Sequence, residues 1–200
     1  MDRRIPFLLL WNHRDDCPHG CVGFDNRKAA RLMAERVLEF GHRRIAMVAG
    51  VTAWNDRATG RVAGVRDALS VKGLNLEPPY LIEADYSIEA SAKAAARLLN
   101  LSPRPTAVIS GNDVQAAGAL RAARAAGLRV PEDLSIVGFD DIELASALDP
   151  PLTTMHVPHR RMGRAAAKRL LSMISQDEPS LNVLFETRIV ERGSLGAAPN

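Results

Sequence analysis

The feature of this sequence that most constrains its fold is a repeated alternation between short apolar runs and amphipathic helical stretches. Apolar runs typical of buried strands lie at residues 45–48, 106–110 and 134–139, with a weaker run at 80–82. Helical patterns lie at residues 27–40, 59–72, 87–99 and 113–126. Neighbouring parallel strands need a crossover connection, which is usually a helix. The alternation therefore predicts an α/β fold with doubly wound, mostly parallel sheets.

The two ends of the chain depart from this rhythm. Residues 5–10 form an apolar run that predicts a buried parallel strand, and residues 12–23 have the composition of a polar loop. After Asp140 the patterns predict a short helical stretch at 142–148, an extended segment at 152–157, an amphipathic helix at 160–174 and a last strand at 183–190. The tail at 196–200 is expected to fray because chain ends are ordered only where they are tied down.

Composition and charge exclude several classes of protein. Apolar residues make up 46% and charged residues 24% of the 200 residues, which excludes disordered, collagen-like and disulfide-scaffold chains. Lys and Arg number 26 against 23 acidic residues and are scattered, so no basic face for nucleic acid is expected. Two cysteines, with neither a signal peptide nor an apolar run of membrane length, predict a cytoplasmic protein without a membrane segment.

Polar side chains stand directly after two of the predicted strands. Asn112 and Asp113 follow one apolar run, and Asp140 and Asp141 follow another. Ligands of open α/β sheets bind just outside these strand ends, so Asn112 and Asp140 are candidates to hydrogen-bond a ligand. A plainer role suits them equally, in which Asp141 and either Asn112 or Asp113 cap the helices that follow. The sequence leaves both interpretations open.

Two arginines follow the strand predicted at 45–48 and lie one helical turn apart. Arg57 and Arg61 can point to one side, where guanidinium groups suit a carboxylate or vicinal hydroxyls. Arginines on a helix surface are, however, more often only solvated. Asn55 lies in the same polar loop, and Tyr86 follows the weak strand, where an aromatic ring can stack on a sugar or a base.

The loop that carries Cys17 and Cys21, near His13, suggests a metal site. A single C-x3-C pair lacks the second pair of ligands found in structural zinc sites, so we favour ordinary loop residues. The sequence contains no phosphate-binding loop, nucleophile elbow or catalytic Ser, His or Cys arrangement. We therefore expect no metal, no cofactor and no enzymatic activity.

An ordered series of segments across residues 5–195 resembles the LacI/GalR family of transcriptional repressors. The segments are 22–26 (VGFDN), 40–46 (FGHRRIA), 60–64 (GRVAG), 105–108 (PTAV), Asn112-Asp113, 127–135 (GLRVPEDLS), 136–141 (IVGFDD), 151–154 (PLTT), Met162-Gly163 with Ala166, and Arg192-Gly193-Ser194. Each motif alone is weakly specific, whereas their shared order is strongly specific.

The resemblance implies an effector domain similar to periplasmic binding proteins, in which two α/β lobes hinge around a small ligand, often a sugar or a purine. It implies that Arg61 clamps this effector and that Tyr86 stacks on it. Asn112 and Asp140 would hydrogen-bond its polar groups. These four residues are the strand-end and loop positions that their chemistry already singles out.

Three further residues take part in the expected pocket. Asn55 and Arg57 match pocket positions of the family less closely, and His159 stands where relatives place an aromatic residue from the other lobe. Arg57 replaces a residue that is often small and polar. Its extra guanidinium favours an acidic effector, such as a sugar acid or a sugar phosphate.

The resemblance also implies how the chain divides. A partial N-terminal lobe would contain residues 1–42 and 157–183, and the C-terminal lobe residues 43–156 and 184–195. The chain would cross between the lobes near residues 41–43, 156–159 and 181–184. The N-terminal helix-turn-helix of the family and the opening strand-helix units of the first lobe have no counterpart in this sequence. We therefore expect an N-terminally truncated regulator.

These expectations lead to one functional hypothesis and two rivals. We expect the sensing and dimerisation part of a cytoplasmic repressor, a homodimer that binds a sugar, a sugar acid or a purine. It would reach operator DNA only through the missing helix-turn-helix, so the isolated chain would not bind that DNA. The first rival is a periplasmic-type sugar-binding protein of a transporter, which would need a signal peptide. The second is an enzyme on a doubly wound fold, for which the sequence offers no catalytic group.

Overall fold

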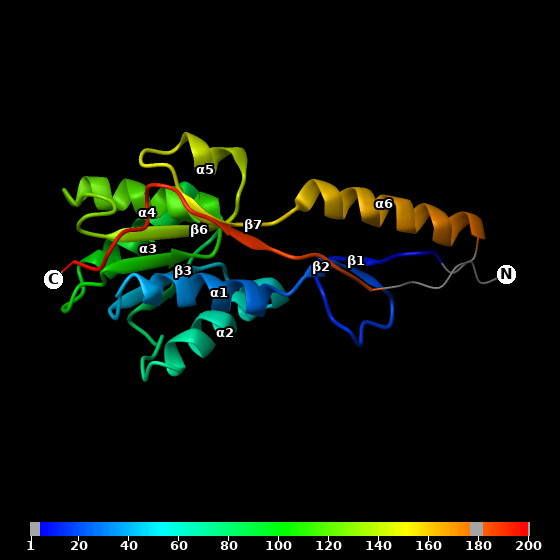
Figure 1. Cartoon of the computed structure of the whole chain (residues 1–200), viewed down its shortest axis with the longest axis horizontal. Helices are drawn as coiled ribbons and strands as arrows, with labels where there is room; N and C mark the ends of the chain where they lie inside the picture. Colours follow the sequence, from blue (N-terminus) through cyan, green and yellow to red (C-terminus); the bar gives the residue numbers. More distant parts are fainter. Residues whose placement is uncertain (1–4, 177–181, 200) are drawn as a thin grey trace.

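The structure is a computed structural model that describes residues 5–176 and 182–199. The molecule is elongated and has two parts, which Figure 1 shows end to end. The larger body contains a six-stranded sheet with strand order β4-β3-β5-β6-β7-β9, and the smaller body contains a three-stranded sheet with order β1-β2-β8. The two sheets confirm the predicted doubly wound α/β class.

The sheet of the larger body is parallel except at one edge. Its strands are β3 (Ile45–Ala49), β4 (Leu81–Glu83), β5 (Ala107–Ser110), β6 (Ser135–Asp140), β7 (Thr153–His156) and β9 (Arg188–Val190). Only β9 is antiparallel, and it pairs with β7. The first five strands lie where the apolar runs and the extended segment predict them, within one or two residues at each end.

Helices cover both faces of this sheet. They are α1 (Asn26–Glu39), α2 (Asp56–Ser70), α3 (Ile88–Leu99), α4 (Asp113–Ala125) and the short α5 (Glu143–Ala147). Met47 of β3 packs on the side of α1 and α2, whereas its neighbour Val48 packs on the side of α3 and α4. Because successive side chains of a strand point to opposite faces, both faces need apolar residues. This explains the continuous apolar runs of the sequence.

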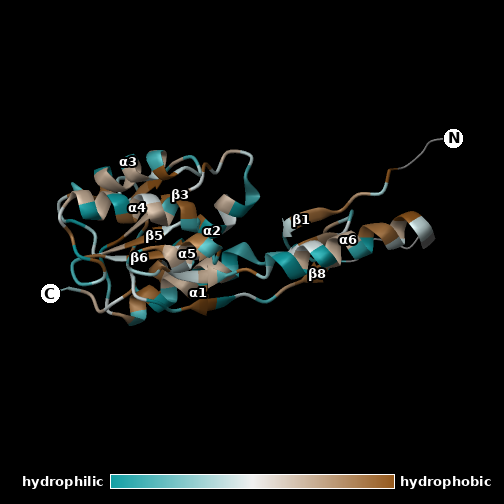
Figure 2. Ribbon diagram, turned by 90° about the horizontal axis from the view of Figure 1, so that it is seen from above, coloured by the Kyte–Doolittle hydropathy of each residue, from teal (hydrophilic) through white to brown (hydrophobic). Residues whose placement is uncertain are grey.

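The smaller body consists of a thin sheet and one long helix. Its elements are β1 (Leu9–Asn12), β2 (Cys21–Phe24), β8 (Val183–Leu184) and α6 (His159–Gln176). Figure 2 shows apolar residues along β1 and in the outer part of α6. None of the described helices combines the length and the apolar character that a membrane crossing requires.

Two predictions for the start of the chain are wrong. The strand expected at residues 5–10 begins only at Leu9, and Leu9 and Leu10 are 48% and 47% exposed rather than buried. An apolar run becomes buried only where a second layer packs on it. The polar loop expected at 12–23 ends in β2, whose four residues are all buried. This strand is too short for a sequence pattern, and its partners β1 and β8 are what define it.

The single strand expected at residues 183–190 is two strands. β8 pairs in parallel with β2 of the smaller body, and β9 pairs with β7 of the larger body. The residues between them therefore connect the two sheets. The chain also passes between the bodies from β7 to α6.

The first passage between the bodies differs from the expected position near residues 41–43. The chain leaves the three-stranded sheet at the end of β2, and α1 packs directly against α2 in the larger body (Figure 1). A Cβ atom at Gly64 of α2 would collide with the backbone of Arg27 of α1, so the two helices are in close contact. The helix at 26–39, which the resemblance assigns to the first lobe, thus lies on the six-stranded sheet.

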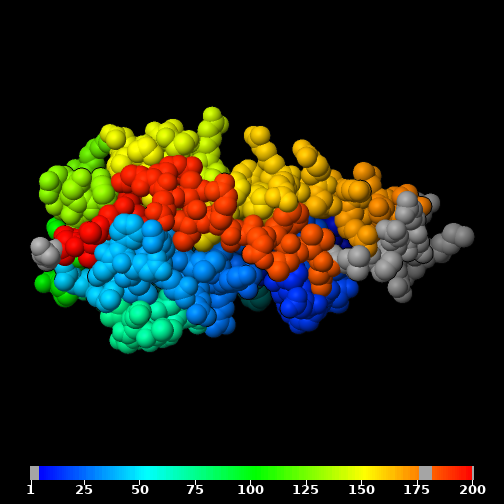
Figure 3. All heavy atoms as spheres, in the orientation of Figure 1, coloured from blue at the N-terminus to red at the C-terminus, as the bar shows by residue number. Residues whose placement is uncertain are grey.

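The chain after β9 is held in place. Figure 3 shows it (red) along the surface between α1 and α5, where Arg36 of α1 donates to Glu191 at 2.7 Å. The amide of Ala198 donates to the carbonyl of Phe40 at 2.8 Å, and Nε2 of the buried His42 lies 3.0 Å from the carbonyl oxygen of Gly196. The expected fraying is therefore wrong for residues 196–199, because backbone bonds anchor them. Asn200 lies outside the described residues.

Candidate functional site

Arg61 is the centre of a polar cluster on the side of the larger body that faces the smaller body. Its side chain is only 8% exposed. The Nε atom donates to Oδ1 of Asn26 at 2.9 Å, one terminal nitrogen donates to Oδ1 of Asp140 at 3.2 Å, and the other donates to the carbonyl of Gly111. The guanidinium also lies 3.8 Å from the centre of the Phe139 ring. Each guanidinium nitrogen thus has a partner within the protein.

The electrostatics of the cluster are dominated by burial and by this ion pair. Burial lowers the pKa of Arg61, whereas the nearby Asp140 raises it. Burial raises the pKa of Asp140, and Arg61 opposes this, with smaller contributions from His159 and Arg57. Three of the predicted site residues, Arg61, Arg57 and His159, therefore lie close enough to act on one carboxylate. A buried charge is tolerated when it is paired in this way.

The backbone turns sharply at the end of β6. Asp140 and Asp141 both have positive φ angles, +105° and +57°. Such a conformation costs free energy for a residue other than glycine and persists where the surrounding structure enforces it. The turn directs the Asp140 carboxylate to Arg61 and the Asp141 carboxylate to His156 and Arg192, with contacts of 2.8 Å and 2.7 Å. Asp141 therefore does not cap α5, whose N-cap residue Ile142 has no side-chain cap bond.

Asp113 stabilises this turn through its hydrogen bonds. Its Oδ2 atom accepts from the backbone amide of Ile142 at 2.9 Å, and its Oδ1 atom accepts from the hydroxyl of Thr154 at 2.5 Å. Burial raises the pKa of Asp113 to about 6, although both hydrogen bonds lower it. Because the amide of Ile142 follows Asp140 and Asp141 directly, Asp113 holds the residues that present the two carboxylates. The sequence suggests only a cap here.

Asn112 and Asn55 each have a structural role beside their predicted one. Asn112 caps α4 by accepting from the amide of Gln115 at 2.8 Å, and Asn55 caps α2 by accepting from the amide of Ala58 at 3.2 Å. The Asn55 amide also donates to the hydroxyl of Tyr86 at 3.3 Å. The capping interpretation of Asn112 is therefore confirmed, whereas the cap by Asn55 is a role that the sequence pattern does not predict. An N-cap side chain keeps further hydrogen-bonding capacity, so capping does not remove these residues from the site.

Tyr86 lies over the end of β3. Its ring packs on Gly50 so closely that a Cβ atom at position 50 would collide with the tyrosine hydroxyl. Its side chain nevertheless remains 46% exposed. The glycine thus leaves room for an aromatic ring at the strand end, with one part of the ring free for a ligand.

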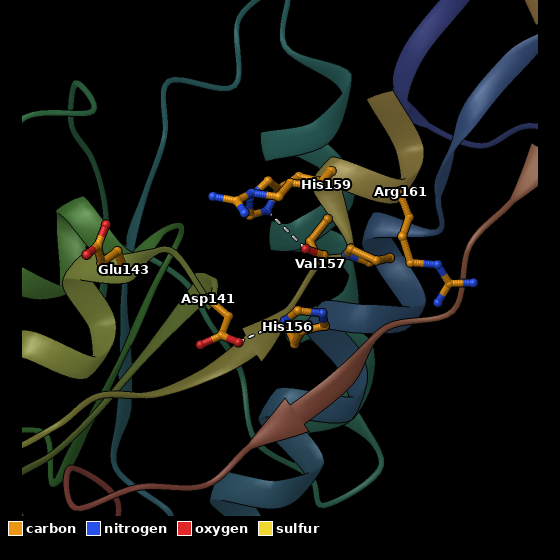
Figure 4. A pocket seen from close by; sticks show the side chains of 8 residues that line it. Asp141, Glu143, His156, Val157, His159 and Arg161 are labelled. Atoms are coloured by element: carbon orange, nitrogen blue, oxygen red, sulfur yellow. Dashed lines mark hydrogen bonds and ion pairs between the residues drawn. The ribbon is translucent and has the colours of Figure 1, made fainter. Parts of the chain in front are cut away.

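Two surface hollows flank the cluster. One has a volume of about 350 Å³ and is lined by Asp141, Glu143, His156, Val157, Pro158, His159, Arg160 and Arg161 (Figure 4). The other has a volume of about 320 Å³ and is lined by Leu9, Leu10, Asn12, Arg14, Cys17, Cys21, Asp56 and Arg57. Each shares one residue with the predicted site, His159 and Arg57 respectively. Figure 4 shows His159 at the start of α6, with its ring toward the hollow.

Asn26 is a site residue that the prediction missed. It is buried, its carboxamide oxygen accepts from Arg61, and its Nδ2 donates to the carbonyl of Trp11 at 3.0 Å. It thereby connects β1 of the smaller body with the buried arginine of the larger body. The signal available was its place beside Asp25 in the 22–26 motif. In the described ranges 5–176 and 182–199, no three His, Cys, Asp or Glu side chains gather to hold a metal ion.

Comparisons with known proteins agree with this architecture. The model of the periplasmic binding protein-like domain matches residues 34–195. The HTH-type transcriptional repressor CytR of Escherichia coli (strain K12) is 41% identical over 199 residues, which are 98% of this chain and 58% of CytR. A LacI-family regulatory protein from Chloroflexus aggregans superposes with a TM-score of 0.86 at 31% identity, over 96% of this chain and 69% of that chain.

A second similar structure is a complex with a sugar. The complex of the transcriptional regulator CelR with cellobiose superposes with a TM-score of 0.85 at 30% identity, over 96% of this chain and 66% of that chain. These relatives are regulators of transcription and not enzymes. The present chain spans a little over half the length of the curated repressors that it matches, 58% for CytR. Since the domain model covers most of the chain, the chain belongs to the periplasmic binding protein-like family, in the group of LacI-type transcriptional regulators.

Proposed function

We propose that this chain is the effector-sensing part of a LacI-type regulator and that a small polyhydroxylated effector binds at the Arg61–Asp140 cluster. The observation that carries the proposal is the Asp140 carboxylate, which Arg61 holds at the strand end that faces the smaller body. Burial and pairing fix this carboxylate before a ligand arrives. Pre-organised acceptors of this kind suit hydroxyl groups.

The residues around Asp140 define the chemistry of the effector. Oδ1 of Asp140 is bound to Arg61, so Oδ2 has capacity for ligand hydroxyls. The half-exposed ring of Tyr86 offers a stacking face for a sugar or a purine. Arg57 is exposed and suits an acidic group, which favours a sugar acid or a sugar phosphate. The cellobiose bound to CelR supports a sugar or a sugar derivative.

The role proposed for Arg61 differs from the ligand clamp that the resemblance implies. Its three nitrogens already donate to Asn26, Gly111 and Asp140. We therefore assign Arg61 to positioning the Asp140 carboxylate and to joining the two bodies through Asn26. Direct recognition of the effector falls to Asp140, Tyr86 and the exposed guanidinium of Arg57.

Effector binding would act through the angle between the two bodies. We propose these bodies as the two lobes, connected after β2, between β7 and α6, and between β8 and β9. An effector shifts such an equilibrium only by its different affinity for the two arrangements. In the proposed regulator, a cytoplasmic homodimer, this shift would reach a helix-turn-helix outside these 200 residues. This chain matches only 58% of the length of CytR, which is consistent with such an additional segment.

A binding screen tests the proposal. Sugars, sugar acids, sugar phosphates and nucleosides are tested by thermal shift, and hits are titrated by calorimetry against the wild type and Asp140→Asn. Hydrogen bonds to a charged group contribute about 1.5–3 kcal/mol, so Asp140→Asn is expected to weaken a hit by about 10- to 100-fold. Asp149→Asn is the matched control because Asp149 is an exposed aspartate outside the cluster. Unchanged affinity in Asp140→Asn would place the effector elsewhere.

A further inference from the structure

Cys17 and Cys21 form a pair of thiols at the edge of the smaller body, and the effector site does not use them. Both are free cysteines, Cys17 half-buried and Cys21 buried. Both line the hollow of about 320 Å³ that also contains Arg57. Cys17 lies in the loop between β1 and β2, whereas Cys21 is the first residue of β2. One thiol is thus on a loop and the other on a strand that two neighbouring strands hold.

Both cysteines donate hydrogen bonds to the backbone carbonyl of the same residue, Arg14. The carbonyl of Arg14 accepts from the amide of Cys17 at 3.2 Å and from the thiol of Cys21 at 3.5 Å. A turn closes the intervening residues, since the amide of Gly20 donates to the carbonyl of Cys17 at 3.4 Å. The shared acceptor and the closed turn keep the two residues on one short loop, so joining their side chains requires no long-range movement.

The thiols also influence each other. Burial raises the pKa of the Cys21 thiol, and a backbone hydrogen bond from Arg14 opposes this rise. The neighbouring Cys17 side chain raises the pKa further through charge and hydrogen bonding. Cys21 is therefore kept as a thiol, whereas Cys17 is the more accessible of the two. The part of the chain that the structure describes offers no third ligand to make this pair a metal site. Asn182, which contacts the Cys21 sulfur at 3.4 Å, supplies an amide oxygen, a poor partner for a soft metal.

We propose that Cys17 and Cys21 form a reversible intramolecular disulfide when the protein meets a hydroperoxide. The Cys17 thiolate attacks the peroxide, the O–O bond breaks, and Cys17 becomes a sulfenic acid as hydroxide or alkoxide leaves. The Cys21 sulfur then attacks the Cys17 sulfur, the S–O bond breaks, and water leaves after proton transfer from the Cys21 thiol. Both sulfurs are oxidised by one electron each, and the peroxide accepts the two electrons. A dithiol reductant reverses the reaction by thiol–disulfide exchange.

A disulfide at this site would act on neighbouring elements of the smaller body. The amide of Cys21 donates to Oδ1 of Asn182 at 3.0 Å, and Asn182 in turn donates to the carbonyl of Asp15 at 2.9 Å. The proposed crosslink therefore ties together the loop, the start of β2 and Asn182, which directly precedes β8. Cys17 of the loop and Cys21 of β2 also line the hollow that contains Arg57.

Intact-mass measurement on the whole chain tests the proposal. The reduced protein is treated with hydrogen peroxide, remaining thiols are alkylated, and peptides are mapped. The expected product has lost two hydrogens, contains a Cys17–Cys21 crosslink within one chain, and is restored by dithiothreitol. Cys17→Ser and Cys21→Ser are each expected to lose this product. Oxidation only to sulfinic acid, or crosslinking only between chains, would overturn the proposal.

A second measurement separates a built site from two cysteines that are merely close in sequence. The folded protein and the urea-unfolded protein are equilibrated with reduced and oxidised glutathione. If the turn holds the thiols in suitable geometry, the folded chain favours the disulfide by about tenfold or more over the unfolded chain. Equal or lower oxidation of the folded chain would refute the inference. This readout concerns the thiols alone, so it is independent of the proposed effector.

Discussion

The two bodies of this molecule use similar apolar patterns with different outcomes. In the larger body the run at β3 is fully buried, because α1 and α2 cover one face and α3 and α4 the other. In the smaller body Leu9 and Leu10 of β1 remain about half exposed, and Leu171 and Ile174 of α6 are 66% and 63% exposed. The apolar run encodes the strand in both places. Burial depends on the number of layers that pack on it.

The difference means that stability should be concentrated in the larger body. Buried apolar area, rather than apolar composition, supplies the hydrophobic free energy of folding. The same substitution should therefore have unequal effects in the two bodies. Four experiments, taken from the largest expected effect to the smallest, test this comparison.

The largest effect is expected from removing a buried leucine of the larger body. Leu134 is fully buried beside α3 and α4, so Leu134→Ala should cost about 2–5 kcal/mol of the free energy of unfolding. Leu10→Ala, the matched change on the half-exposed β1, should cost well under half of that. Urea denaturation of both variants measures the difference. Equal losses would show that the two bodies are packed equally well.

The next effect is a dependence of stability on pH that arises at Asp113. The pKa of Asp113 is raised to about 6 by burial in the larger body, above the ordinary aspartate value. The contribution of Asp113 to the free energy of unfolding is complete at a pH below the ordinary aspartate pKa. This contribution is lost as the pH rises through about 6. The shift corresponds to about 3 kcal/mol. The wild type should therefore gain stability relative to Asp113→Asn as the pH falls from 7 to 4, measured by urea denaturation.

Asp16 of the smaller body provides a control of opposite sign. It is exposed, and the side-chain hydrogen bond from Arg14 lowers its pKa. The contribution of such a group is present at neutral pH and is lost as the pH falls through the lowered pKa. Asp16→Asn should thus change little between pH 7 and 5. A pH-independent difference between the wild type and Asp113→Asn would contradict the role given to its burial.

A pair of glycine-to-alanine substitutions tests the placement of α1. The Cβ atom of Gly64→Ala would collide with the carbonyl of Arg27 in α1, so this variant should lose about 1–3 kcal/mol. Gly163 of α6 has nothing within 4 Å of the corresponding position. Gly163→Ala should instead gain about 0.5–1 kcal/mol from helix propensity. Thermal unfolding of the two variants should shift in opposite directions. A gain in Gly64→Ala would mean that α1 does not pack tightly on α2.

The smallest effect on stability is expected at the exposed face of α6. Leu171→Gln removes an apolar side chain that is largely in solvent, so the free energy of unfolding should change by less than about 0.5 kcal/mol. The exposed apolar surface should fall, and so should the binding of a dye that reports such surface. A large loss of stability would show that α6 is covered in solution.

The elements of the larger body could be predicted because their signals are local. Asp25, Ser87 and Asn112 are cap residues beside clear helical periodicity, and each accepts from the amide three residues later. The strand at 21–24 and the division of residues 183–190 into two strands could not be found in this way. Both depend on pairing with β1, β2 or β7, which are distant in the sequence.

The candidate site shows the same division. Arg61 and Asp140 could be selected because guanidinium and carboxylate groups near strand ends suit polar ligands, and they lie 3.2 Å apart. Because 79 residues separate them in the chain, no local sequence pattern shows that Arg61 and Asp140 pair with each other. The sequence does not single out Asn26 and Asp113 for the site, because each looks like part of a helix start. Only the fold shows that Asn26 accepts a hydrogen bond from the buried Arg61 and that Asp113 holds the turn at Asp140.

The sequence by itself determined the α/β class, the order of the helices and strands from α1 to β7, and the residue types available for a polar ligand. These follow from periodicity and from caps, which act over a few residues. The tertiary structure decided which apolar runs are buried, that α1 packs on α2, and that Arg61 binds Asn26, Gly111 and Asp140. Burial and ion pairing require partners that are distant in the chain, and local patterns carry no record of those partners.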